Sequence, residues 1–266
     1  MPNSVPNSVP DPAPVSTRRR FLTSAALTST ALTSTGTAAL IAACTPNGGS
    51  GSDPVIHGEH GRTEDTAGLT PDQALQKLTE GNERFVAMTE VEPNVSSTRL
   101  MAVSAGQRPF VGVLGCVDSR VPPELVFDRG LGDVFDARIA GAIPDDAAIG
   151  SLEFGVDEFE VPLLVVLGHS RCGAVTAAVT LVDSGRSDVP GKIGAVVSPI
   201  LPSVRAVQAR GVSGDAVVDA AARDVVRRSV AELRGSPVLA QRFASGTLQV
   251  VGAFYDLDTG KVEFLD

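Results

Sequence analysis

Two short segments of this 266-residue chain carry side chains that can hold a metal ion. The first segment contains Cys116 and Asp118, followed by Arg120, which can pair with the carboxylate. The second contains His169 and Cys172. Two thiols and an imidazole form a ligand set that zinc favours. Three protein ligands leave the fourth position of a tetrahedral site open to water, which is typical of a catalytic zinc rather than a structural one. The residue types therefore predict one Zn²⁺ per chain.

The spacing of these residues supports a shared site. His169 and Cys172 are separated by two residues and can occupy one strand-to-helix turn, while Cys116 arrives from a different strand. Gly173 then begins a helix, whose N-terminal N–H groups and dipole favour a thiolate at Cys172. The same N–H groups can bind an anion, so Gly173 is a candidate substrate-binding residue.

Asp118 and Arg120 form a second candidate feature. On an extended strand end, residues two apart point to the same side, so we expect this carboxylate and guanidinium to pair. The pair keeps the carboxylate ionised and oriented. Its functional interpretation is an acceptor for the hydrogen of the nucleophilic water at zinc. The alternative is an ion pair that only stabilises the fold.

The elements that must position these residues alternate between strands and helices. The chain is predicted to fold as an α/β protein with a central, mostly parallel sheet flanked by helices, because buried apolar runs alternate with helical patterns. The chemistry is expected at the carboxyl ends of the strands. The expected strands are Phe110–Leu114, Asp133–Ile139, Pro162–Leu167 and a hairpin of Thr247–Tyr255 with Val262–Leu265; the expected helices begin at Thr70-Pro71 and cover Ala147–Phe159, Arg171–Val182 and most of Ile193–Phe243, with breaks near Gly211–Gly214 and Gly235–Pro237.

Composition excludes some classes of function. The net charge is −9, no long run of Lys or Arg occurs, Trp is absent and Tyr255 is the single Tyr. These features argue against a nucleic-acid-binding surface. The chain has only three Cys, which is too few for a disulfide framework.

The N-terminal region has the pattern of an export signal. We therefore divide the chain into a signal peptide (1–43), a flexible linker (44–67) and a folded domain (68–266). Arg18 to Arg20 precede an apolar stretch and resemble a twin-arginine signal. Leu40–Cys44 resembles a bacterial lipobox, in which Cys44 is lipidated. The expected location is therefore outside the cytoplasm: lipid-anchored on the outer face of the cell membrane, or else secreted or periplasmic. A cytoplasmic protein with a mis-assigned start is the remaining alternative.

The paired motifs Cys-x-Asp-x-Arg and His-x-x-Cys-Gly resemble those of the β-class carbonic anhydrases. The resemblance runs from about Leu69 to Asp266 and includes Glu80 to Phe85 and Gly112–Pro122. It implies reversible hydration of carbon dioxide to bicarbonate and a proton, and a homodimer or homotetramer. The residues to which it gives roles are Cys116, His169 and Cys172 as zinc ligands, Asp118 and Arg120 as a catalytic dyad, Asp118 also as a conditional fourth ligand, and Gln107 as a substrate contact.

Three points stay open at this stage. Gln107 is equally well explained as an ordinary loop residue. Relatives with the same zinc ligands hydrolyse carbonyl sulfide or carbon disulfide, and many relatives have a polar residue where Ile139 or Ala142 stands. A zinc-binding protein without turnover is the alternative from another class, although such a protein has no use for the Asp118–Arg120 pair.

Overall fold

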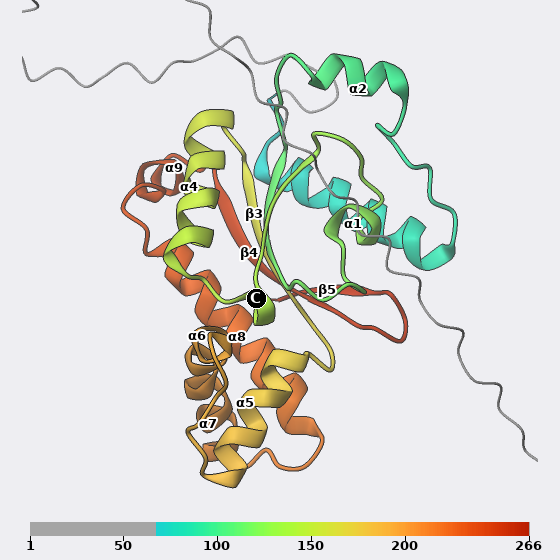
Figure 1. The fold of residues 1–266 in the computed structure, drawn as a ribbon. Coiled ribbons are helices and arrows are strands. Elements are labelled where there is room, and N and C mark those ends of the chain that lie inside the picture. Colours follow the sequence, from blue (N-terminus) through green and yellow to red (C-terminus); the bar gives the residue numbers. More distant parts are fainter. Residues whose placement is uncertain (1–67, 266) are drawn as a thin grey trace, which may run out of the picture. The chain divides into compact units, whose positions relative to one another are not determined.

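The computed structural model describes residues 68–265 (Figure 1). The predicted signal peptide, linker and Cys44 lie outside the described residues, so those predictions stay predictions. Within residues 68–265, none of the helices combines the length and the apolar character that crossing a membrane would require.

The architecture is built on a five-stranded sheet. Four strands are parallel, and the last runs antiparallel to its neighbour, which confirms the mostly parallel sheet and the terminal hairpin. Across the sheet the strand order is β2 (Val134–Arg138), β1 (Val111–Gly115), β3 (Leu163–His169), β4 (Gln249–Tyr255) and β5 (Val262–Leu265).

Strand β3 explains why the sheet is buried on both sides. All seven of its residues are buried, and its side chains alternate between two apolar clusters. Leu163, Val165 and Leu167 pack toward helices α1 (Pro71–Ala87) and α3 (Pro123–Val126). Leu164 and Val166 pack toward α4 (Asp146–Phe159) and α8 (Ala216–Arg234) on the opposite face. A strand covered on both faces needs apolar residues throughout, as its sequence has.

A third apolar cluster lies beyond the carboxyl ends of the strands. It joins the first half of α8 to α5 (Gly173–Ser184), α6 (Ile193–Val197) and α7 (Leu201–Ala209). Figure 1 shows these helices together at the end of the sheet where β3 passes into α5. Cys116 and Cys172 belong to this cluster. The two candidate thiols therefore lie between the sheet and the helices that cover its carboxyl edge.

The boundaries of several elements agree with expectation. Helix α1 starts with a capping box in which the side chains of Thr70 and Gln73 each accept a backbone N–H from the other residue. The long helical region breaks around Gly211 and Gly214, both at positive φ, and again at Gly235. Helix α9 (Ala240–Ala244) follows the second break. The 3-10 turn η2 (Ser198–Ile200) lies before the first break, between α6 and α7.

Some elements differ from expectation. Strand β3 continues to His169, and α5 starts at Gly173 rather than at Arg171, because Arg171 has a φ of 53° that no α-helix accommodates. Three short elements were not expected from the sequence, since each has too few residues for a periodic pattern. They are α2 (Ser97–Val103), α3 and the 3-10 turn η1 (Ala140–Ala142).

Candidate metal centre

The structure brings the three predicted ligands together. The ligand atoms of Cys116, His169 and Cys172 all lie within 4.8 Å of one another, and all three residues are buried. Cys116 directly follows β1, His169 is the last residue of β3, and Cys172 is the N-cap of α5. Because β1 and β3 are parallel neighbours, with Gly115 paired to Leu167, their carboxyl ends deliver the ligands to one edge of the sheet.

The chemistry of this group fits zinc. The Nδ1 of His169 lies 2.9 Å from the carbonyl oxygen of Ser170, which can only accept, so in the neutral imidazole Nδ1 carries the hydrogen and Nε2 carries the lone pair. That Nε2 atom is buried and has no hydrogen-bond partner among the described residues. A buried polar atom without a partner is costly, and a bound metal would satisfy it. Two thiols complete a donor set typical of zinc.

Asp118 and Arg120 form the expected pair, but by a different geometry. The guanidinium contacts both carboxylate oxygens, at 2.9 Å from Nε to Oδ1 and 2.8 Å from Nη2 to Oδ2. The backbone N–H of Arg120 also donates to Asp118 Oδ1 at 3.0 Å, so the two residues meet across a turn rather than along a strand end. This corrects the expectation of an extended segment: strand β1 ends at Gly115, and a turn brings the side chains together.

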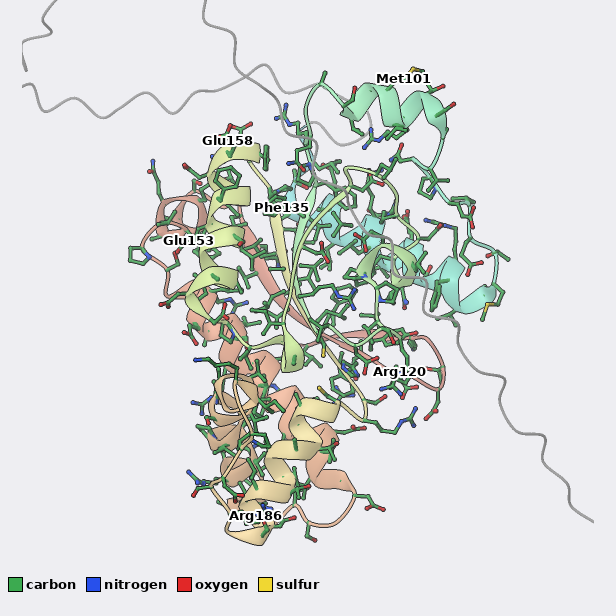
Figure 2. The ribbon with its side chains drawn as sticks, in the orientation of Figure 1. Met101, Arg120, Phe135, Glu153, Glu158 and Arg186 are labelled. Carbon is green, nitrogen blue, oxygen red and sulfur yellow. The ribbon has the colours of Figure 1, made fainter. Side chains whose placement is uncertain are left out.

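The carboxylate lies at the margin of the ligand group. Asp118 Oδ2 is 3.9 Å from His169 Nε2, while its other contacts hold it against Arg120. Figure 2 shows Arg120 at the same end of the sheet as the β3-to-α5 connection, with Phe135 further along the sheet. Asp118 is thus close to the ligand set but paired away from it.

Gln107 and Gly173 are placed differently. Gln107 is exposed and precedes β1, whereas Cys116 follows that strand, so the two residues lie at opposite ends of the same strand. Within one chain the structure does not bring Gln107 to the ligand group. Gly173 is the first residue of α5, directly after a ligand, and a Cβ placed there would meet nothing within 4 Å. The space beside Gly173 is therefore open.

Comparison with known proteins identifies the family. A profile described as carbonic anhydrase matches residues 111–262. Carbonic anhydrase 2 of Mycobacterium tuberculosis is 41% identical over 198 residues, which is 74% of this chain and 93% of that protein. A carbonic anhydrase of Mycolicibacterium smegmatis is 41% identical over 195 residues, covering 73% and 92% of the two chains. This chain belongs to the carbonic anhydrase family.

Solved structures place this carbonic anhydrase in the β class. The Coccomyxa β-carbonic anhydrase is 28% identical, with a TM-score of 0.57 over 72% of this chain and 86% of that one. The β-carbonic anhydrase CafA of Aspergillus fumigatus is 26% identical, with a TM-score of 0.58 over 73% and 90% of the chains. A tetrameric β-carbonic anhydrase of Sordaria macrospora is 25% identical, with a TM-score of 0.56 over 62% and 85%.

Electrostatics in the centre of this carbonic anhydrase prepare one thiolate before metal binds. The pKa of the Cys116 thiol is lowered to about 4, chiefly because the Cys172 thiol donates a hydrogen bond to it, with His169 and the N–H of Gly141 adding to the effect. The pKa of Cys172 is raised, first by this bond to Cys116 and then by burial. Burial alone would lower the pKa of His169, but the Cys116 thiolate beside it raises that pKa. Cys116 is therefore the more acidic of the two thiols.

The dyad of this carbonic anhydrase stays ionised. The hydrogen bond from the Arg120 side chain holds the pKa of Asp118 well below its usual range, and the backbone N–H of Arg120 acts in the same direction. Asp118 is consequently a carboxylate throughout neutral pH, and as such it can only accept hydrogen bonds.

Two residues that position the site were missed by sequence reasoning. Arg138, the last residue of β2, donates to the carbonyl oxygens of Cys116 and Asp118 at 2.9 and 2.6 Å, so it holds the segment that carries both functional side chains. Gly141 donates its backbone N–H to Cys116 Sγ at 3.3 Å and has a φ of 81°. A glycine two residues after a predicted strand is the available signal for the second residue. No sequence signal indicates the first.

Proposed function

We propose that this carbonic anhydrase hydrates carbon dioxide reversibly through one zinc ion held by Cys116, His169 and Cys172. The observation that carries the proposal is the buried, unpartnered Nε2 of His169 in a group with two thiols, all within 4.8 Å. When bound, zinc supplies the Lewis acidity that makes water a nucleophile near neutral pH.

Asp118 then acts as an orienting acceptor. Its carboxylate stays ionised and lies 3.9 Å from His169 Nε2. It can therefore accept a hydrogen bond from the attacking water and so orient a lone pair of the water oxygen toward carbon dioxide. Arg120 fixes that carboxylate through two side-chain bonds and keeps it paired outside the ligand set. If the Arg120 pairing breaks, Asp118 becomes the conditional fourth ligand. X-ray absorption on the zinc-loaded protein, which distinguishes an oxygen from Asp118 by its loss in Asp118→Asn, tests this role.

The open space at Gly173 is the proposed place for bicarbonate. The positive end of the α5 dipole favours an anion there, and a Cβ placed on Gly173 would meet nothing within 4 Å. Gln107 can serve this site only from a second chain, because in its own chain it lies at the opposite end of β1. A change in the bicarbonate KM for Gln107→Ala, without a change in zinc content, would support that role.

The proposed assembly is a homodimer or homotetramer. Large apolar side chains remain exposed among the described residues, including Met101 at 67% and Phe154 at 55%. Burying such side chains against a second chain would remove apolar surface from water. The Sordaria macrospora relative is described as tetrameric. Sedimentation equilibrium should return the mass of two or four chains, and a monomer at micromolar concentration would contradict the assembly.

The proposed location is outside the cytoplasm. The support is the sequence of residues 1–44, which resembles a twin-arginine signal ending in a lipobox. Twin-arginine systems carry folded proteins, so zinc bound before export would protect the two ligand thiols from oxidation. Trapping an unfolded, metal-free precursor on the general secretion route would contradict this order of events.

Stopped-flow hydration of carbon dioxide tests the function. Zinc-loaded protein should accelerate the reaction, and Cys172→Ser should fall to the uncatalysed rate, because serine replaces a thiolate ligand with a weakly acidic hydroxyl. Metal analysis of both proteins accompanies the kinetics. One bound zinc per chain without turnover at any pH would contradict the proposal.

A further inference from the structure

The turn between His169 and Cys172 is held by contacts from two other parts of the chain. The carbonyl oxygen of Tyr255 accepts the N–H of Ser170 at 3.0 Å, and the hydroxyl of Ser170 accepts the N–H of Leu257 at 3.0 Å. From α8, Asp219 Oδ1 accepts the N–H of Arg171 at 2.8 Å. The β4–β5 hairpin and α8 therefore both fasten the two residues that separate the ligands.

One peptide group connects His169 to Asp219. The C=O of the Ser170–Arg171 peptide accepts the hydrogen of His169 Nδ1 at 2.9 Å. The N–H of the same peptide donates to Asp219 Oδ1 at 2.8 Å. A peptide is planar, so fixing its N–H also fixes the direction of its C=O. The carboxylate, the peptide and the imidazole form a continuous series of hydrogen bonds that ends at the ligand atom Nε2.

The conformation of Arg171 shows why this peptide needs support. Its φ of 53° lies in the left-handed region, which costs a non-glycine residue about 1–2 kcal/mol. Its guanidinium is bound by both oxygens of Asp258, at 2.7 and 2.8 Å. That pair is exposed, and pairs of this kind contribute little. The half-buried Asp219, which holds the main chain itself, is the stronger restraint.

We propose that Asp219 is a positioning residue for the metal ligand His169 and acts through the Ser170–Arg171 peptide. This inference rests on the zinc centre proposed above. A carboxylate accepting the peptide N–H polarises the peptide, which makes its C=O a better acceptor for Nδ1–H and makes Nε2 a better donor to the metal. Many metal-binding histidines receive this support from a carboxylate or a carbonyl directly. Here the carboxylate of a distant helix supplies it through one intervening peptide.

Three variants separate this role from general effects on α8. Asp219→Ala removes the acceptor, and Asp219→Asn keeps an acceptor oxygen of the same shape while removing the charge. Asp224→Ala is the matched control, because it removes another carboxylate of the same helix, one that accepts from Arg210 Nη2 at 2.9 Å. All three are made in the full chain and loaded with zinc.

Two measurements report on the metal centre itself. The first is the rate of zinc release to an excess of a chromogenic chelator. The second is the visible absorption spectrum of the cobalt-substituted protein, which responds to ligand geometry. We expect Asp219→Ala to release zinc about 10-fold faster, Asp219→Asn to fall between it and the unmodified protein, and Asp224→Ala to match the unmodified protein. The cobalt bands should shift in the two Asp219 variants only.

Several results would overturn the inference. One is zinc release and cobalt bands unchanged in both Asp219 variants. Another is equal acceleration in Asp219→Ala and Asp224→Ala, which would assign the effect to α8 as a whole. If Asp219→Ala does not fold, the isosteric Asp219→Asn decides by the same two readouts. A failure to retain zinc in the unmodified protein is a distinguishable result, because it would overturn the metal centre and this inference together.

Discussion

At the scale of single residues, charge and hydrogen bonding separate the candidate metal ligands from the Asp118–Arg120 pair. The thiols of Cys116 and Cys172 are hydrogen-bonded, with the pKa of the first lowered and that of the second raised. Asp118 is prevented from joining them by its two bonds to Arg120. The proposed metal ligands and the carboxylate proposed to direct water are therefore kept distinct, although Asp118 Oδ2 and His169 Nε2 are only 3.9 Å apart.

Asp118→Asn tests this division. Asparagine has the same shape but weakens the pairing with Arg120 and presents an amide that can turn a donor toward the water. We expect kcat to fall by about 100-fold while zinc content stays at one per chain. Because the pKa of Asp118 is well below its usual range, the loss should be uniform across neutral pH. Stopped-flow kinetics with metal analysis measures both, and unchanged kcat would remove Asp118 from the mechanism.

At the scale of elements, a glycine permits one helix to pack closely against its neighbour. Gly81 of α1 lies against the main chain of α3, and a Cβ at this position would overlap the carbonyl of Phe127, whose carbon would be 2.7 Å away. This contact sets how closely α1 covers the face of the sheet formed by Leu163, Val165 and Leu167. Asn82, the next residue, binds the β4–β5 turn through Gly260 O and Val262 N.

Gly81→Ala is expected to lower the free energy of unfolding by about 2–3 kcal/mol, because the added methyl group meets backbone that cannot move aside. Gly150→Ala is the matched control on α4, where a Cβ meets nothing within 4 Å. The control should be stabilising by about 0.5–1 kcal/mol, since alanine favours the helix. Thermal unfolding of the two variants measures the contrast. Equal midpoints would show that α1 and α3 adjust freely.

At the scale of the whole molecule, an acidic enzyme is proposed to act outside the cytoplasm. The net charge of −9 gives no attraction to anionic lipid, so the proposed attachment to a membrane would come from acyl chains on Cys44. Such an anchor leaves the catalytic domain free of any need for a membrane-spanning helix.

Cys44→Ser tests the anchor. Serine cannot be lipidated through a thioether, so we expect the protein to move from the membrane fraction to the soluble extracytoplasmic fraction. Activity per zinc should be unchanged, because Cys44 is not among the ligand residues. Fractionation of cells expressing both forms measures the distribution. Unmodified protein that is already soluble would show that the lipobox resemblance has no consequence.

The sequence by itself determined the order of the strands and the longer helices, and it selected the three residues of the candidate metal site. Apolar runs such as Pro162–Leu167 predict buried strands through local pattern, and soft ligands at strand ends predict zinc through their chemistry. The apolar runs and the ligand motifs each lie within a few consecutive residues, so they can be recognised without knowledge of any distant contact.

Only the tertiary structure decided how those ligands are supported. Arg138, Gly141 and Asp219 reach the site from β2, η1 and α8. The side chains of Arg138 and Asp219 bind backbone groups of neighbouring segments, and Gly141 donates its own backbone N–H to the thiol of Cys116. A contact between a side chain and a distant main chain leaves no pattern in the sequence, since any residue provides the backbone group. The meeting of Asp118 and Arg120 across a turn was hidden for a related reason, because a local backbone angle determined it.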